Sequence, residues 1–304
     1  MSTFSASDAA LTGFRVATQH PIAIAIWAVG YLALSLVTGW LTVSLGPDVT
    51  QQMMDLAQQD PATVDVQAMM ALYAKILPTY GAIMLCHLVY YSLAQPAAYR
   101  AVLRPEKSAF GYLRIGPDEL RQLVVNIVLS LVLMAVYLGS ALVVGLAVGA
   151  LQLAIGGGQA AQVLGAFVAI VLILGVTLVV GVRLSLAGPQ TLAEGRIRLF
   201  DSWRLTKGQF WNVFGCYAIA LILSVIVTLL GLTMVYAAAA VLGGGMQGIQ
   251  ALSKPDLTSV ATYFTPLMLV AVVLMSVISA MALAIMLTPP AEIYRNLAGD
   301  REQA

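Results

Sequence analysis

The sequence predicts an all-α membrane protein with six transmembrane helices, organised as one integral membrane domain over residues 1–304. Composition is the first reason: 60% of the residues are hydrophobic and 10% are charged, whereas soluble chains carry about 25% charged residues. The second reason is that six long apolar stretches contain no Asp or Glu. The third is that Lys and Arg gather in alternate connections between these stretches.

Each apolar stretch is long enough to cross a bilayer as a helix. A helix needs about 20 apolar residues to span the hydrocarbon, and its backbone polar groups must be bonded within the segment. The first stretch is too long for the apolar part of a cleavable signal peptide, so we expect it to be retained. The predicted spans are residues 21–45, 77–99, 123–153, 160–187, 213–242 and 263–287.

The positions of Lys and Arg predict the orientation, because positively charged connections stay on the cytoplasmic side. Lys75 and Lys254 are the cations of the connections after the first, third and fifth spans. Twelve others lie in the terminal segments and in the connections after the second and fourth spans: Arg15, Arg100, Arg104, Lys107, Arg114, Arg121, Arg196, Arg198, Arg204, Lys207, Arg295 and Arg301. We therefore expect both termini in the cytoplasm.

A short pattern recurs and predicts an internal repeat. Residues 92–96 (SLAQP) recur as residues 185–189 (SLAGP), with a weaker copy at 287–291. An aromatic residue beside or near a cation precedes each odd-numbered span, at Phe14, Tyr112 and Trp203. These matches predict three related helix hairpins, with approximate repeats at residues 5–103, 104–196 and 197–295.

Each repeat is expected to end at a proline and to continue as an amphipathic elbow on the cytoplasmic surface. Proline disrupts a helix interior, so Pro96, Pro189 and Pro290 are predicted helix breaks. Residues 191–210 mix apolar and basic side chains, which is typical of a helix in the headgroup region. We expect Phe14, Tyr112 and Trp203 to be interfacial aromatics. An ordinary loop without lipid preference is the alternative.

The longest polar stretch, residues 46–79, lies on the opposite side of the predicted membrane. Asp48 and Pro61 resemble helix starts, and apolar residues including Met53 and Met69 supply one apolar face. We expect short helices that rest on the outer leaflet.

Few side chains of the sequence suit catalysis. The two histidines are His20 and His87, and no HExxH, CxxC, P-loop or GxSxG pattern is present. We expect no enzymatic activity, no metal and no cofactor. His87 is expected to form a packing hydrogen bond inside the membrane, with a functional role as the alternative. Cys86 and Cys216 are expected to be buried, and a net charge of +1 argues against nucleic acid as a partner.

Arg183 is the most informative polar residue in the predicted spans. Arginine in a span costs about 2.5–3.5 kcal/mol on insertion scales, and no carboxylate shares the hydrocarbon with it. Its guanidinium must therefore meet a carbonyl, a lipid phosphate or an anionic ligand. One interpretation is that Arg183 reaches to the headgroups. The other is a phosphate-holding site formed with Arg204 or Lys207.

Residues 183–189 (RLSLAGP) and 201–211 (DSWRLTKGQFW) carry a family resemblance. They are similar to the multi-pass membrane domain attached to some bacterial glycerophosphodiester phosphodiesterases, and to related stand-alone inner-membrane proteins. In that family an R-x-x-x-A-x-P span end is followed by S-W-x-L-T-K-G-x-F-W. The match is good over residues 183–211 and faint elsewhere. It implies a six-helix protein of the bacterial inner membrane, but not phosphodiesterase activity, because the catalytic domain with its His and Glu residues is absent.

These observations predict a non-enzymatic integral membrane protein that organises or senses the bilayer, interacts with lipids or scaffolds a partner. A transporter or channel for a small or lipidic solute is the alternative. A polar cavity at mid-depth would favour transport, whereas a groove that opens sideways to lipid near Arg183 would favour lipid handling. Membrane lipids are the expected partners, and both a homo-oligomer and a different membrane-protein partner stay open.

Overall fold

The computed structural model describes residues 5–58, 65–106, 109–155 and 158–302. Over these residues it is helical without a strand, which confirms the all-α class. Six of the described helices are long and apolar enough to cross a membrane, as predicted. They are α3 (Pro21–Val43), α5 (Val66–Leu103), α6 (Pro117–Ile155), α7 (Gln159–Leu184), α10 (Phe210–Leu242) and α13 (Pro266–Leu287).

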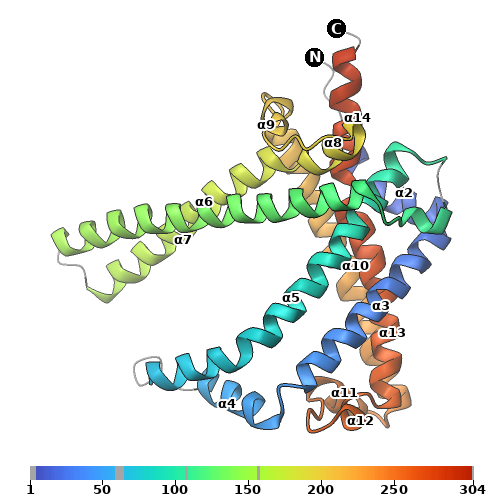
Figure 1. Cartoon of the computed structure of the whole chain (residues 1–304). Coiled ribbons are helices and arrows are strands. Elements are labelled where there is room, and N and C mark those ends of the chain that lie inside the picture. The colour runs from blue at the N-terminus through green and yellow to red at the C-terminus, as the bar shows by residue number, and fades with distance from the viewer. Residues whose placement is uncertain (1–4, 59–64, 107–108, 156–157, 303–304) are drawn as a thin grey trace.

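Shorter helices gather at two ends of the molecule (Figure 1). One end, which we call the terminal end, holds α1 (Ala6–Ala10), α2 (Thr12–Gln19), α8 (Ala187–Glu194), α9 (Asp201–Leu205) and α14 (Pro289–Glu302). The opposite end, the distal end, holds α4 (Pro47–Gln58), α11 (Met246–Ser253) and α12 (Val260–Tyr263). A 3-10 turn, η1 (Ala109–Tyr112), lies between α5 and α6 and packs against α3 and α5.

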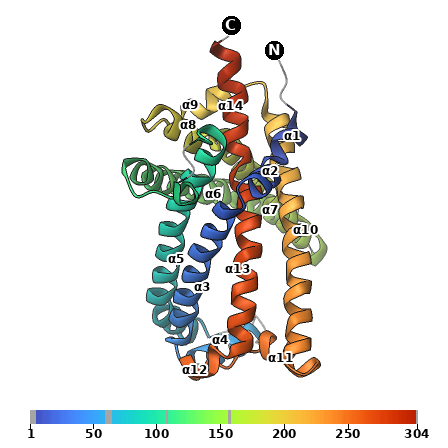
Figure 2. The same cartoon turned by 90° about the vertical axis from the view of Figure 1, so that its right-hand side faces the viewer.

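The six long helices spread apart instead of forming one parallel bundle. Figure 2 shows α3, α5, α10 and α13 running from the terminal to the distal end, and α13 packs against both α10 and α3. The α6–α7 hairpin projects sideways, and α6 contacts α5 and α8 near its base (Figure 1). The most apolar parts of α6 and α7 contain no buried residue. Such uniformly apolar helices need hydrocarbon around them.

The buried core lies at the terminal end, in two clusters. The first surrounds Trp27, Tyr99 and Tyr112, and the second surrounds Val213 and Ile285. Cys216 belongs to the second cluster, as expected, whereas Cys86 is only half-buried. The chain is thus most tightly packed where its terminal helices, short connections and span ends meet.

The three predicted proline breaks differ in the structure. Pro96 lies inside α5, which continues to Leu103, so the predicted break at this position is wrong. Ala97, Ala98 and Tyr99 are buried in the first cluster, and this packing holds the helix together although proline removes one backbone hydrogen bond. Pro189 and Pro290 lie in the first turns of α8 and α14. Proline is tolerated there because the first backbone N–H groups of a helix have no intrahelical acceptor.

The predicted amphipathic helix over residues 191–210 is not one helix. α8 ends at Glu194, Gly195 has a left-handed φ of 66°, and α9 is short before α10 begins at Phe210. Glycine ends a helix in this way because it has no Cβ to clash in the left-handed conformation.

The stretch at residues 46–79 also differs from the prediction. α4 is a separate short helix, but residues 66–79 form the start of α5. The Asp65 carboxylate caps this helix by accepting hydrogen bonds from the N–H groups of Gln67 and Ala68. Pro61 lies outside the described residues.

Candidate functional site

Arg183 at the end of α7 is bound by the following segment of the chain. Its Nη1 donates to the backbone carbonyl of Thr206 at 2.6 Å. The guanidinium also lies over the rings of Trp203 and Phe210, with Cζ at 5.8 and 5.5 Å from the ring centroids. Cation–π contacts of this kind add to the hydrogen bond. Of the partners considered for Arg183, the structure therefore contains a backbone carbonyl.

Two hydroxyl groups complete the contact between α7 and α9. Ser202 Oγ donates to the Arg183 carbonyl at 2.8 Å and accepts from the N–H of Leu186 at 3.1 Å. Both Ser202 and Thr206 are fully buried. These bonds satisfy backbone groups where α7 ends and α8 begins, which would otherwise lack partners. α9 is thus rigidly attached to the end of the fourth span.

The guanidinium of Arg183 keeps unused donors. An arginine side chain has five N–H donors, and one is used by Thr206. Within the described part of the chain, no carboxylate forms an ion pair with Arg183. Arg204 and Lys207 are exposed on α9 and on the turn after it. The structure brings Arg183 to the segment that carries both cations.

A groove of about 890 Å³ runs beside this segment, between α7 and α10. Leu174, Gly175 and Leu178 line it from α7, and Ala218 and Leu221 line it from α10. Leu174, Leu178 and Leu221 are about half exposed, so the groove opens to the side of the molecule. Its lining is mainly apolar.

One end of the groove is polar. Tyr217 donates from its hydroxyl to Ser185 Oγ at 2.7 Å, and both residues line the groove. Ser185 lies two residues after Arg183, so this polar end is next to α9 at the terminal end. An apolar channel with polar groups at one end matches the chemistry of an amphipathic ligand.

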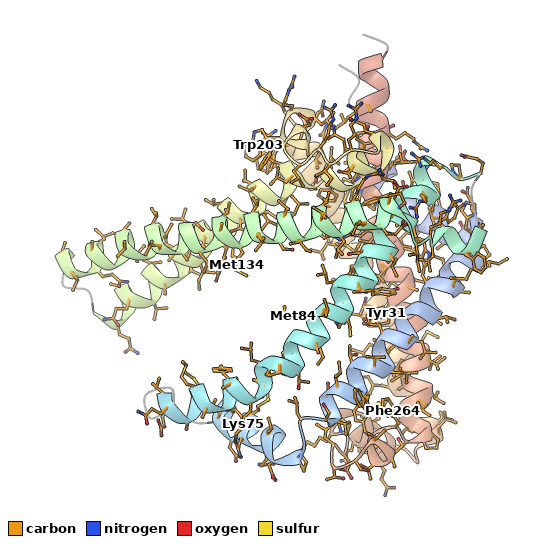
Figure 3. All side chains as sticks on the ribbon, in the orientation of Figure 1. Tyr31, Lys75, Met84, Met134, Trp203 and Phe264 are labelled. Carbon is orange, nitrogen blue, oxygen red and sulfur yellow. The ribbon has the colours of Figure 1, made fainter. Side chains whose placement is uncertain are left out.

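The three predicted interfacial aromatics have different surroundings. Trp203 on α9 is 44% exposed and lies at the terminal end (Figure 3). Phe14 is half-buried against the second cluster. Tyr112 is fully buried, so its ring packs within the protein instead of facing lipid as an exposed anchor would. Its hydroxyl donates to the Pro105 carbonyl at 3.0 Å, and its ring packs edge-on against His20.

A buried ion pair at the terminal end was not predicted from the sequence. Arg100 is 2% exposed, and its Nη2 donates to Glu119 Oε1 at 2.5 Å. Its Nη1 donates to the Tyr112 carbonyl at 3.0 Å. Arg100 was interpreted only as an orientation signal, and no role was predicted for Glu119. This pair ties α5 to α6, so its evident role is structural.

The remaining candidates show ordinary contacts. His87 Nδ1 lies 2.9 Å from the Ile83 carbonyl of its own helix. Among the described residues, no three His, Cys, Asp or Glu side chains are grouped to hold a metal ion. No family model, curated protein or solved structure matches this chain.

Proposed function

We propose that this protein is a non-enzymatic integral membrane protein that binds membrane lipid in the α7–α10 groove. The groove itself carries the proposal: it is apolar, opens sideways and ends at hydroxyl groups beside Arg183. Its volume of about 890 Å³ lies within the usual range of ligand sites, about 300–1,000 Å³. An acyl chain suits such a lining better than a small polar solute, which disfavours the part of the transporter alternative that concerns small polar solutes.

We further propose that the lipid carries a phosphate at the polar end of the groove. Arg183 is held in place by Thr206 and has donors left for an anion. Arg204 and Lys207 on the adjoining segment add positive charge, and the exposed ring of Trp203 suits the headgroup region. Arg183 would be the fixed contact and the two exposed cations the adaptable ones.

The finer features of the sequence prediction belong to the same proposal. The terminal end faces the cytoplasm, as the positions of Lys and Arg predict, and the protein lies in the bacterial inner membrane, as the family resemblance implies. The three hairpins are repeats, in which an arginine at the end of a span binds the connection that follows. Two parallel contacts support this: Arg100 donates to the Tyr112 carbonyl and Arg183 to the Thr206 carbonyl, each in the segment that leads into the next span.

Native mass spectrometry of the detergent-purified protein tests the groove. Gly175 has open space around it, so Gly175→Leu would fill the groove, and Ala218→Leu would fill it from the other wall. Both variants should retain less phospholipid than the wild type. Gly145→Leu is the matched control, because Gly145 also faces open space but lies on α6 outside the groove. Equal lipid retention in all four proteins would refute lipid binding at this site.

Arg183→Leu tests the phosphate contact in the same measurement. We expect it to lower the share of anionic phospholipid among the lipids that remain bound. Lys207→Gln should cause a smaller drop because Lys207 is exposed. Unchanged anionic lipid in Arg183→Leu would mean that this guanidinium serves only α9.

A further inference from the structure

The turn between α5 and α6 has an unusual backbone. Phe110, Gly111 and Tyr112 have φ values of 50°, 61° and 65°, so three successive residues are left-handed. For residues with a Cβ this conformation is unfavourable, and it persists only where the surroundings enforce it. Figure 1 shows this connection beside α2 and the start of α3.

Buried contacts enforce the conformation. Trp27 donates from Nε1 to the Gly111 carbonyl at 2.8 Å, and Arg100 donates to the next carbonyl, that of Tyr112. A Cβ at Gly111 would lie 3.0 Å from Ala23 Cα, so the turn also lies directly on α3. The turn is therefore rigid.

The same turn displays two large apolar side chains. Phe110 is 83% exposed and Ile115 is 95% exposed, whereas Tyr112 between them is fully buried. Nearby, Ile22 at the start of α3 is also well exposed. Arg104 and Arg114 lie on this connection, against one carboxylate, Glu106, in its described part. The turn thus exposes two large apolar side chains on a connection that carries positive charge.

We propose that the 109–116 turn is a wedge that inserts Phe110 and Ile115 into the headgroup region of an anionic leaflet. The position of the turn argues for lipid as the occupant. It joins the ends of two spans and packs on the start of a third, so it lies at the membrane edge. Apolar tips flanked by cations are the chemistry of interfacial anchors. A rigid turn also loses little entropy on insertion.

This wedge does not depend on the α7–α10 groove. Its residues come from the α5–α6 connection and share no side chain with the groove lining. Because the turn leads directly into α6 at Pro117, the depth of the wedge would set the level at which the α6–α7 hairpin enters the membrane.

Nitroxide accessibility in lipid nanodiscs tests the wedge. The background is Cys86→Ala, with Cys216 retained because it is buried, and this background alone serves as the unlabelled control. Labels are placed at Phe110→Cys and, separately, at Ile115→Cys. Leu164→Cys, at an exposed position of α7, provides the hydrocarbon reference, and Ser7→Cys, at an exposed position of α1, provides the aqueous one.

For each nitroxide, the measured quantity is the ratio of its collision rate with oxygen to its collision rate with a water-soluble nickel complex. We expect this ratio to be several-fold higher at both turn positions than at Ser7→Cys. Their ratio should rise further when phosphatidylglycerol replaces phosphatidylcholine. Because Ile115 lies outside the left-handed residues, its label reports even if Phe110→Cys disturbs the turn. Water-like ratios at Ile115 in both lipids would overturn the proposal. A partner protein would then be the alternative occupant of this turn.

Discussion

At the scale of single residues, arginines at the terminal end bind the carboxyl ends of helices. Arg104 donates to the Leu192 carbonyl in the last turn of α8, and Arg295 to the Val102 carbonyl in the last turn of α5. The last carbonyls of a helix lack intrahelical donors and lie at its negative end. Arg183 contacts Thr206 just after α9 in the same way. Backbone carbonyls can thus serve as partners for arginine side chains in a chain that is poor in carboxylates.

The buried Arg100–Glu119 pair should be the most sensitive charged contact. Glu119→Ala would leave the buried Arg100 guanidinium with only the longer contact to Asp118, and breaking a buried ion pair costs about 3–5 kcal/mol. Asp118→Asn is the matched control: Asp118 contacts the same guanidinium at 3.4 Å but is more exposed. We expect it to cost less than about 1 kcal/mol. Thermal unfolding in detergent would measure both, and equal melting temperatures would contradict the assignment.

Asp256 at the distal end predicts a local pH dependence. Hydrogen bonds from Thr258 lower the pKa of the Asp256 carboxyl, and one of them joins the Thr258 N–H to Oδ1 at 2.9 Å. A lowered folded-state pKa means that the contact stabilises the loop above the unfolded-state pKa and is lost as pH falls through the folded-state value. Amide exchange at Thr258, corrected for its intrinsic pH dependence, should lose protection on acidification. Asp256→Asn should abolish that change.

At the scale of elements, glycines set how closely some helices approach. A Cβ at Gly13 of α2 would meet the backbone of Ile285 in α13, which cannot move as a side chain can. Gly13→Ala should therefore destabilise the protein by about 1–3 kcal/mol. Gly145→Ala on α6 is the control, because Gly145 faces open space and alanine favours helix by up to about 1 kcal/mol. A melting temperature for Gly13→Ala at or above that of the control would contradict this contact.

The helices could be predicted from the sequence because apolar runs without carboxylates have few alternatives in a membrane. Five of the six start within about six residues of the prediction, whereas α5 begins at Val66 instead of residue 77. The extra segment, residues 66–76, is mostly apolar but contains Lys75, and it was interpreted as part of a separate helix on the outer leaflet. Pro96 misled because burial of the residues after it outweighs the local preference of proline.

The candidate site could be predicted only in part. Arg183 was identified because a lone cation in an apolar run requires a partner. The groove beside it depends on how α7 and α10 are placed, and no local pattern encodes that contact. The same limit explains Tyr112, whose sequence neighbours resemble an interface although α3 and α5 bury it.

At the scale of the whole molecule, the stabilising contacts are concentrated at one end. Both core clusters and the ion pairs of the described residues lie at the terminal end. Exposed side chains such as Met84 on α5 and Met134 on α6 lie on helices that spread apart (Figure 3). Away from the terminal end, the exposed faces of α5, α6 and α7 therefore depend on lipid for their apolar contacts.

Because the spans alternate in direction, the orientation of the terminal end determines the orientation of the whole molecule. Twelve Lys and Arg residues lie in segments assigned to that end by sequence, and such charges keep a segment on the cytoplasmic side. Fusions of green fluorescent protein after Arg104 or Arg198 should fluoresce. Alkaline phosphatase fused after Lys254, at the distal end, should be active. Because the spans alternate direction, active phosphatase after Arg104 would invert the orientation and remove the cytoplasmic placement of Arg183 as well.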